Sequence, residues 1–196
     1  YAPSAELLSE TSRLAPGEFY GVTKHCSEQV LESYTAYFDL SLLRLFVPYG
    51  PGQRGRMIPN IAKAVREGRP VVLVNGGHPY VNPVFIDDVV AVMRQALRRP
   101  GTHVLNVAGP ESISVREIAT IAGTLVGREP VFEEGSEAPA SDLLADITAL
   151  RSRFAIPDLV GPVEGIRRLL EADDLHDRRE APPLLGRGEM CPARVS

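Results

Sequence analysis

The sequence contains no tryptophan, only two cysteines and only two lysines among its 21 basic residues. Cys26 and Cys191 lie far apart and match no metal-binding or redox spacing, which predicts free thiols in a reducing compartment. No stretch approaches the roughly 18 apolar residues of a membrane span, and the first residues lack the basic and apolar parts of a signal peptide. We therefore expect a cytoplasmic protein with no membrane partner.

The rest of the composition is that of an ordinary globular protein. The 196 residues are 44% hydrophobic and 23% charged, enough for one core or one and a half domains. The formal charge of −4 gives no electrostatic reason to expect nucleic acid as a partner. The four histidines are scattered along the chain, so no histidine-based metal site is predicted.

Helical and strand patterns alternate along the chain, which predicts an α/β fold. The dipeptide Asn75-Gly76 between two apolar runs indicates a β-hairpin. Ser114 and Glu117 form an S-x-x-E capping box for a helix that ends at Gly127. The other predicted helices span 18–38, 57–67, 87–99, about 146–154 and 162–173, and the predicted strands span 40–47, 71–74, 80–86, 103–108 and 130–134.

Some polar residues have structural interpretations. Asp87 and Asp88 are predicted to cap the helix that they open, because adjacent residues on a helix do not converge on one point. Arg44 lies within a predicted strand and is expected to anchor a neighbouring carboxylate. The charged, proline-rich and aperiodic residues from 174 to 196 predict a disordered tail.

The segment "GEFYGVTKHCSEQ" places Tyr20 four residues ahead of Lys24 on one face of a predicted helix. A free phenol ionises near pH ~10, so acid/base work near neutrality requires a downward shift of about three units. A nearby cation favours the phenolate and supplies part of that shift. An isolated Tyr-x-x-x-Lys pair is nevertheless common by chance, so the pair alone does not decide between a catalytic device and two side chains on a shared face.

Ordered motifs add context to this pair. The runs "PGEFYGVTKHCSEQVLESY", "LSLLRLFVPYGPGQ", "FIDDVV" and "LNVAGPESISVREIA" resemble, in that order, the extended short-chain dehydrogenase/reductase family. They are most similar to its NAD-dependent epimerase/dehydratase branch, which acts on nucleotide sugars. The resemblance covers about residues 1–173. Its most specific element is P-x-x-x-Y-G-x-[ST]-K-x-x-x-E, matched by Pro16, Tyr20, Gly21, Thr23, Lys24 and Glu28.

The resemblance implies the C-terminal part of a Rossmann-type parallel sheet plus a small α/β substrate-binding region. Residues 1–56 would carry the last part of the Rossmann-like domain, and 57–173 the substrate-binding region and final sheet elements. The family often dimerises through the Tyr-bearing helix, so the apolar stripe of "VLESYTAYF" implies either a homodimer interface or intramolecular core. The implied cofactor is NAD, with NADP as the alternative, and the implied substrate is a sugar nucleotide.

Roles are carried over position by position. Tyr20 would be the acid/base for hydride transfer, and Lys24 would bind the nicotinamide ribose. Both would contact the cofactor, together with Phe46 and Val47 at the carboxyl end of a strand, where such sheets bind ligands. The expected substrate contacts are Tyr49, Gln53 and Arg54, with simple loop packing as the alternative for Tyr49 and Gln53.

The sequence departs from the family pattern in three respects. No G-x-x-G-x-x-G phosphate loop occurs, and the family's third catalytic Ser or Thr would precede Tyr1. Val47 stands where relatives often have a substrate-contacting Asn. Val81 stands where an Arg usually reaches a diphosphate. These departures leave two alternatives open: a non-catalytic relative that acts as a binding or regulatory module, and an NADP-dependent reductase of small carbonyl compounds.

Overall fold

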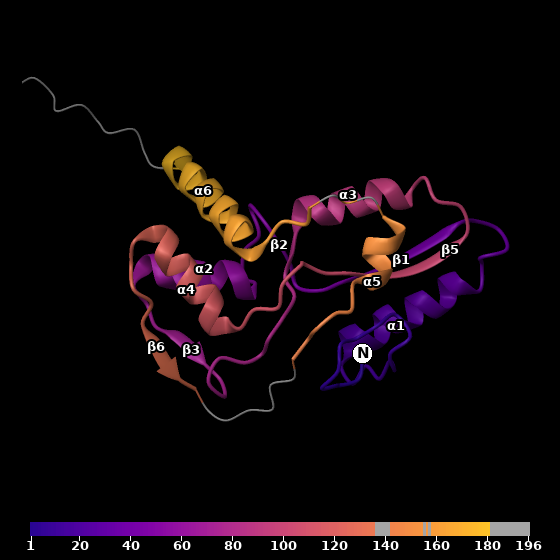
Figure 1. Cartoon of the computed structure of the whole chain (residues 1–196), viewed down its shortest axis with the longest axis horizontal. Helices are drawn as coiled ribbons and strands as arrows, with labels where there is room; N and C mark the ends of the chain where they lie inside the picture. Colours follow the sequence, from indigo (N-terminus) through magenta and orange to yellow (C-terminus); the bar gives the residue numbers. More distant parts are fainter. Residues whose placement is uncertain (136–141, 155, 157, 181–196) are drawn as a thin grey trace, which may run out of the picture.

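The structure is a computed structural model that describes residues 1–135, 142–154, 156 and 158–180. It has the expected α/β fold with parallel strands (Figure 1). The helices are α1 (Phe19–Glu32), α2 (Met57–Glu67), α3 (Ile86–Ala96), α4 (Val115–Val126), α5 (Thr148–Arg153) and α6 (Pro162–Glu180). The strands are β1 (Leu40–Leu45), β2 (Pro48–Tyr49), β3 (Val71–Leu73), β4 (Val84–Phe85), β5 (Thr102–Val107) and β6 (Phe132–Glu134).

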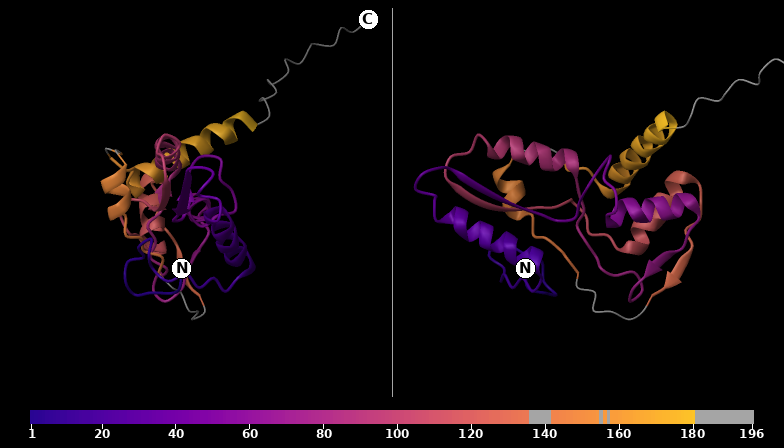
Figure 2. Two further views of the ribbon diagram at one scale, coloured as in Figure 1. Left: turned by 90° about the vertical axis from the view of Figure 1, so that its right-hand side faces the viewer. Right: turned by 180° about the vertical axis from the view of Figure 1, so that it is seen from behind.

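The strands form three parallel pairs, β1 with β5, β2 with β4, and β3 with β6. In the longest pair, Leu40 lies opposite Thr102 and Leu45 opposite Val107. The helices α1 and α3 lie on opposite sides of this pair (Figures 1 and 2). Parallel strands with a helix on each face are the arrangement that buries both sides of a sheet.

The β3–β6 pair belongs to a second group of elements, with α2 and α4 packed together beside it (Figure 1). The buried side of α2 repeats at helical spacing, with Ile58, Ile61, Ala62 and Val65 all at most 8% exposed. The capping box of α4 is present as predicted: the Glu117 amide donates to the Ser114 hydroxyl, and the Ser114 amide donates to the Glu117 carboxylate. Gly127 ends α4 in the left-handed conformation, at φ 66°.

The predicted helix 18–38 is wrong in its last turn and a half, because α1 ends at Glu32. The hydroxyls of Ser33 and Thr35 donate to the carbonyls of Gln29 and Glu32. The backbone amides of Ser33, Tyr34 and Thr35 donate to carbonyls three residues back instead of four, so the α-helical ladder ends here. The following residues up to 37 accordingly form turns.

The predicted β-hairpin is also wrong, since β3 pairs with β6 and β4 with β2. Asn75 and Gly76 do take left-handed conformations, and one antiparallel bridge joins Val74 to His78. The ladder extends no further because Pro79 and Pro83 have no amide hydrogen to donate.

Two further helices, α3 and α6, differ from the prediction at their ends. α3 begins at Ile86 with Phe85 as its N-cap, so Asp87 and Asp88 lie in the first turn rather than at the cap. α6 continues to Glu180, so residues 174–180 of the predicted tail are helical. The remainder of that predicted tail lies outside the described residues.

Candidate active site

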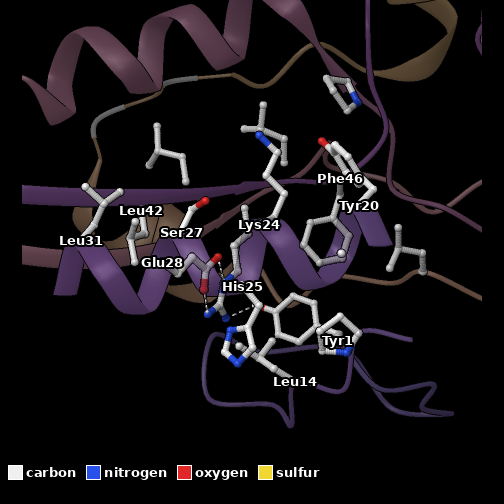
Figure 3. Close-up of a pocket in the computed structure, with 17 residues that line it drawn as sticks. Tyr1, Leu14, Tyr20, Lys24, His25, Ser27, Glu28, Leu31, Leu42 and Phe46 are labelled. Carbon is white, nitrogen blue, oxygen red and sulfur yellow. Dashed lines mark hydrogen bonds and ion pairs between the residues drawn. The ribbon is translucent and has the colours of Figure 1, made fainter. Parts of the chain in front are cut away.

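Tyr20 and Lys24 lie one turn apart on α1 and project from the same side of the helix (Figure 3). The Lys24 Nζ lies 5.5 Å from the centroid of the Tyr20 ring. The Tyr20 side chain is open to a ligand, because 71% of its surface is exposed. The arrangement places an ammonium beside a phenol at a solvent-accessible position, as the sequence spacing predicted.

Both side chains line a cavity of about 590 Å³ between α1 and β1. The floor of this cavity is apolar, since Leu43, Leu45 and Phe46 of the β1 segment contribute to it. Ser27, Glu28 and Arg44 add polar groups at its side. The volume is that of a small-molecule site, in which a few polar groups are placed against an apolar wall.

Arg44 anchors a carboxylate, as the sequence predicted. Its Nη2 and Nε donate to the two carboxylate oxygens of Glu28 at 2.7 and 3.0 Å, which makes the pair bidentate. The pair is partly buried, with side-chain exposures of 14% for Arg44 and 21% for Glu28. The hydrogen bonds to Glu28 raise the pKa of Arg44 above its ordinary value, so the guanidinium stays charged.

The same guanidinium binds the N-terminal segment. Its Nη1 donates to the Tyr1 hydroxyl at 3.0 Å and to the Glu10 carbonyl at 3.1 Å. The Tyr1 hydroxyl in turn donates to the buried side chain of Asn106 in β5. Burial raises the pKa of the Tyr1 phenol, while Arg44 acts in the opposite direction. The sequence did not indicate Tyr1 and Asn106, because nothing in the local pattern of Tyr1 predicts bonds to Arg44 and Asn106, which lie 43 and 105 residues away.

The two expected cofactor contacts after β1 differ in their placement. Phe46 is 2% exposed and lines the cavity beside Tyr20. Val47 does not line that cavity, and its side chain packs against the core that includes Tyr49 and Val81. Val47 has φ 42°, a backbone conformation that is strained for a β-branched residue.

The structure does not bring the three expected substrate contacts together at the Tyr20 cavity. Tyr49 is 2% exposed, and burial raises the pKa of its phenol, with the Asp88 carboxylate adding to the effect. Gln53 donates from Nε2 to the Pro48 carbonyl at 3.0 Å. Arg54 is exposed in the loop that precedes α2.

A second cavity of about 360 Å³ lies between α2 and β3. It is lined mostly by apolar side chains, with Asn60 and His78 as its polar ones. The His78 Nδ1 lies 2.8 Å from Asp142 Oδ1, and the same oxygen accepts from the Tyr80 amide. These hydrogen bonds lower the pKa of Asp142. The sequence did not indicate this pair, because His78 and Asp142 are 64 residues apart in the chain.

The described residues form neither a metal centre nor a membrane span. Among the described residues, no three His, Cys, Asp or Glu side chains gather closely enough to hold a metal ion. None of the described helices is long and apolar enough to cross a membrane.

The parallel strand pairs and the Tyr-Lys helix define a Rossmann-type α/β protein. The sequence profile of the NAD dependent epimerase/dehydratase family matches residues 1–108. This chain therefore belongs to that family.

The chain is similar to known proteins over part of their length. The chain is 27% identical over 155 residues to "Uncharacterized UDP-glucose epimerase YtcB" of Bacillus subtilis (strain 168), which covers 76% of this chain and 49% of YtcB. MoeE5, solved in complex with UDP-glucose and NAD, matches at 26% identity with a TM-score of 0.80, covering 90% of this chain and 62% of MoeE5.

A third match bears on the fold alone. The UDP-glucuronic acid 4-epimerase from Bacillus cereus, solved with UDP-glucuronic acid and NAD, has a TM-score of 0.80 at 23% identity, covering 90% of this chain and 59% of the epimerase. The chain thus spans about half the length of YtcB and about 60% of the solved relatives.

Proposed function

We propose that this chain forms the acid/base part of an NAD-dependent sugar epimerase or dehydratase. The observation that carries the proposal is the Tyr20–Lys24 pair, which opens into the cavity beside Phe46. In this proposal residues 1–56 complete the dinucleotide-binding region and residues 57–173 supply the substrate-binding region and the last sheet elements. A homodimer through α1 belongs to the same proposal, because no residue of α1 is buried.

The residues present fit part of a dinucleotide. An ammonium and a phenol, both reachable from solvent, face the cavity above an apolar floor, which suits a ribose hydroxyl and the edge of a flat ring. Lys24 and Tyr20 would hold this end of NAD, or of NADP, and the sequence contains no glycine-rich loop for the pyrophosphate. Bound NAD would supply the hydride acceptor. The isolated chain is therefore expected to bind the dinucleotide weakly.

The chemistry of the protein's own groups follows from their charges. Oxidation of a sugar carbinol releases a proton from its hydroxyl, and the phenolate of Tyr20 accepts that proton at Oη. The Lys24 ammonium lies 5.5 Å from the centroid of the Tyr20 ring, so its positive charge attracts negative charge that develops on that ring during proton transfer. When the carbonyl is reduced again, the Tyr20 phenol returns the proton.

The substrate is proposed to be a sugar nucleotide, because MoeE5 is solved with UDP-glucose. One observation favours a second candidate, a reductase of small carbonyl compounds. Val81, at the position where the family usually has an arginine for a diphosphate, is 2% exposed and packed in the core. Neither Lys nor Arg lines the described cavity between α2 and β3. Binding of UDP-glucose that weakens when Arg54 is replaced by Met would support the sugar nucleotide, and tight binding of a small ketone alone would support the reductase.

Replacement of Tyr20 tests the proposal in a polypeptide that joins this chain to a complete dinucleotide-binding half. Tyr20→Phe is expected to lower turnover at least about 10²-fold and to leave NAD affinity nearly unchanged, since only the transferable proton is lost. The matched control is Tyr37→Phe, at a tyrosine that is 82% exposed and lies beyond α1. Near-normal turnover of Tyr20→Phe would remove Tyr20 from the chemistry.

A measurement on the natural protein distinguishes the non-catalytic alternative from the enzyme. Its mass and its ultraviolet absorbance report whether a nicotinamide dinucleotide co-purifies. A natural polypeptide that binds no dinucleotide and carries no phosphate loop would favour a binding module over the enzyme.

A further inference from the structure

The helix that carries Tyr20 and Lys24 has no buried residue, so ordinary apolar packing does not fix it on the sheet. Its apolar side chains lie largely in solvent: Phe19 is 86% exposed, Val30 59% and Leu31 40%. A helix of a globular protein is usually held by an apolar stripe on its inner face. Another interaction must set the rotation of α1.

The inner face of α1 consists of Gly21, His25 and Glu28, its partly buried residues. Their spacing of four and three residues places them on one side of the helix. At Gly21 the helix approaches the N-terminal segment so closely that an added Cβ would lie 3.0 Å from Pro16 Cβ. The strongest contact on this face is the bidentate ion pair from Glu28 to Arg44.

Glu28 lies one turn beyond Lys24 and two turns beyond Tyr20 on the same helix. Rotation of α1 about its axis would move all three side chains together. A bidentate pair resists that rotation better than a single hydrogen bond, because both oxygens and both nitrogens are fixed in one plane. Figure 3 shows the dashed contacts of Glu28 on one side of α1 while Tyr20 and Lys24 extend on the other, and the partner in those contacts is Arg44.

Arg44 is itself held in place. It lies in β1, and its Nη1 binds both the Tyr1 hydroxyl and the Glu10 carbonyl. Asn106 of β5 extends the network, because its backbone amide donates to the Glu10 carboxylate at 2.9 Å and its Nδ2 donates to the Leu8 carbonyl at 2.7 Å. The guanidinium therefore binds the N-terminal segment directly, and Tyr1 and Glu10 of that segment bind Asn106 of β5.

We propose that Arg44 is a positioning residue: through Glu28 it sets the rotation of α1 and thereby the placement of the Lys24 ammonium against the Tyr20 ring. The catalytic importance of this placement rests on the proposed function. The position of the Lys24 ammonium relative to the Tyr20 ring can be measured without cofactor or turnover. Arg44 touches neither Tyr20 nor Lys24 in any described contact and acts on them through the helix.

The scarcity of lysine makes the test direct. The chain has two lysines, Lys24 and Lys63, so reductive methylation with ¹³C-formaldehyde gives two lysine signals and one from the N-terminus. The methyl groups on Lys24 are expected to show a ring-current shift, since the Lys24 Nζ lies over the Tyr20 ring. Lys24→Arg assigns the signal by removing it, and Tyr20→Leu shows how much of the shift comes from the ring.

Two variants then break the anchor. Arg44→Met removes the guanidinium, and Glu28→Gln removes the ion pair while leaving Arg44 with its bonds to Tyr1 and Glu10. Both are expected to move the Lys24 signal to its position in Tyr20→Leu and to leave the Lys63 signal in place. Arg69→Met, which breaks the surface ion pair of Arg69 with Glu67, is the matched control and is expected to leave the Lys24 signal unchanged.

Two results would overturn the proposal. One is an unchanged Lys24 shift in folded Arg44→Met and Glu28→Gln, which would mean that other contacts set the rotation of α1. The other is loss of cooperative thermal unfolding in both variants, which would make the ion pair a general stabilising contact with no separate effect on placement. Failure of the Tyr20→Phe activity test would leave this result standing, so the two proposals fail separately.

Discussion

The hydroxyl of Tyr49 occupies the space beside Gly165 in which a side chain would begin. A Cβ built on Gly165 would lie 2.0 Å from the Tyr49 Oη. Tyr49 also packs edge-on against Phe85, with the ring centroids 5.5 Å apart. The absence of a side chain at Gly165 therefore allows the end of β2 to pack directly against α6.

Gly165→Ala is expected to destabilise the protein by about 1–2 kcal/mol in chemical denaturation. Alanine favours a helix over glycine by up to about 1 kcal/mol, but overpacking a tight contact costs about 1–3 kcal/mol. The clash is the larger effect at this separation. In a Tyr49→Phe background the loss should be smaller, because the clashing oxygen is gone and that hydroxyl has no hydrogen-bond partner among the described residues. An equal loss in both backgrounds would contradict this explanation.

Val47→Asn is expected to raise the free energy of unfolding by about 0.5–1 kcal/mol. A left-handed backbone costs a β-branched residue about 1–2 kcal/mol, and Asn tolerates it. The loss of the partly buried Val47 methyl groups offsets part of this gain. Val72→Asn is the control, because Val72 is 55% exposed within strand β3, where Asn is disfavoured. A Val47→Asn protein no more stable than its parent would show that the strain is negligible.

Ser114→Ala is expected to cost about 1 kcal/mol at pH 7, since it removes one half of the α4 capping box. The bonds from Ser114 lower the pKa of Glu117. A lowered carboxyl pKa contributes stability above the ordinary value of about 4.3, and this contribution is lost as the pH falls through the folded-state pKa. The cost of Ser114→Ala should therefore shrink in acid, and a cost that is independent of pH would rule out a role for the Glu117 charge.

Asp88→Asn should stabilise the protein at neutral pH. Asp88 is 5% exposed, its carboxylate accepts from the Val160 amide at 2.9 Å, and burial raises its pKa. A raised carboxyl pKa means that stability falls as the pH rises from the ordinary value of about 3.9 through the folded-state pKa. Asparagine keeps an acceptor for Val160 without the charge, so its advantage should appear above that range and vanish below about pH 4.

Asp146→Asn is the matched control for this pH effect. Hydrogen bonds from Thr148 lower the pKa of Asp146, so its charge contributes stability at neutral pH that is lost as the pH falls through the folded-state pKa. Thermal melts from pH 3 to pH 8 should thus show opposite signs for the two substitutions at neutral pH. The same sign for both would contradict the burial argument for Asp88.

The Tyr20–Lys24 pair was predictable because its geometry is local. Four residues along an α-helix place two side chains on one face wherever the helix is docked. The capping box of Ser114 and the C-terminal Gly127 were predictable for the same reason, since each motif closes within one turn. The sequence predicted that Arg44 binds a carboxylate but did not identify Glu28, because Glu28 lies on another element.

The strand pairing around Asn75 and Gly76 and the burial of Tyr49 could not be predicted from neighbouring residues alone. Asn75 and Gly76 did form a turn, yet the strands on either side found parallel partners in β6 and β2. Tyr49 was expected to contact substrate because it follows the predicted strand 40–47. In the structure it is buried beside α6.

By itself, the sequence determined the α/β class, most of the helix positions and the phenol-ammonium pair, because each depends on spacings shorter than two helical turns. The tertiary structure alone decided which strands pair, that the Tyr1 hydroxyl joins Arg44 to Asn106, and that Val47 adopts a strained backbone. Those features depend on contacts between residues far apart in the chain, where burial and hydrogen-bond satisfaction over the whole core outweigh any local preference.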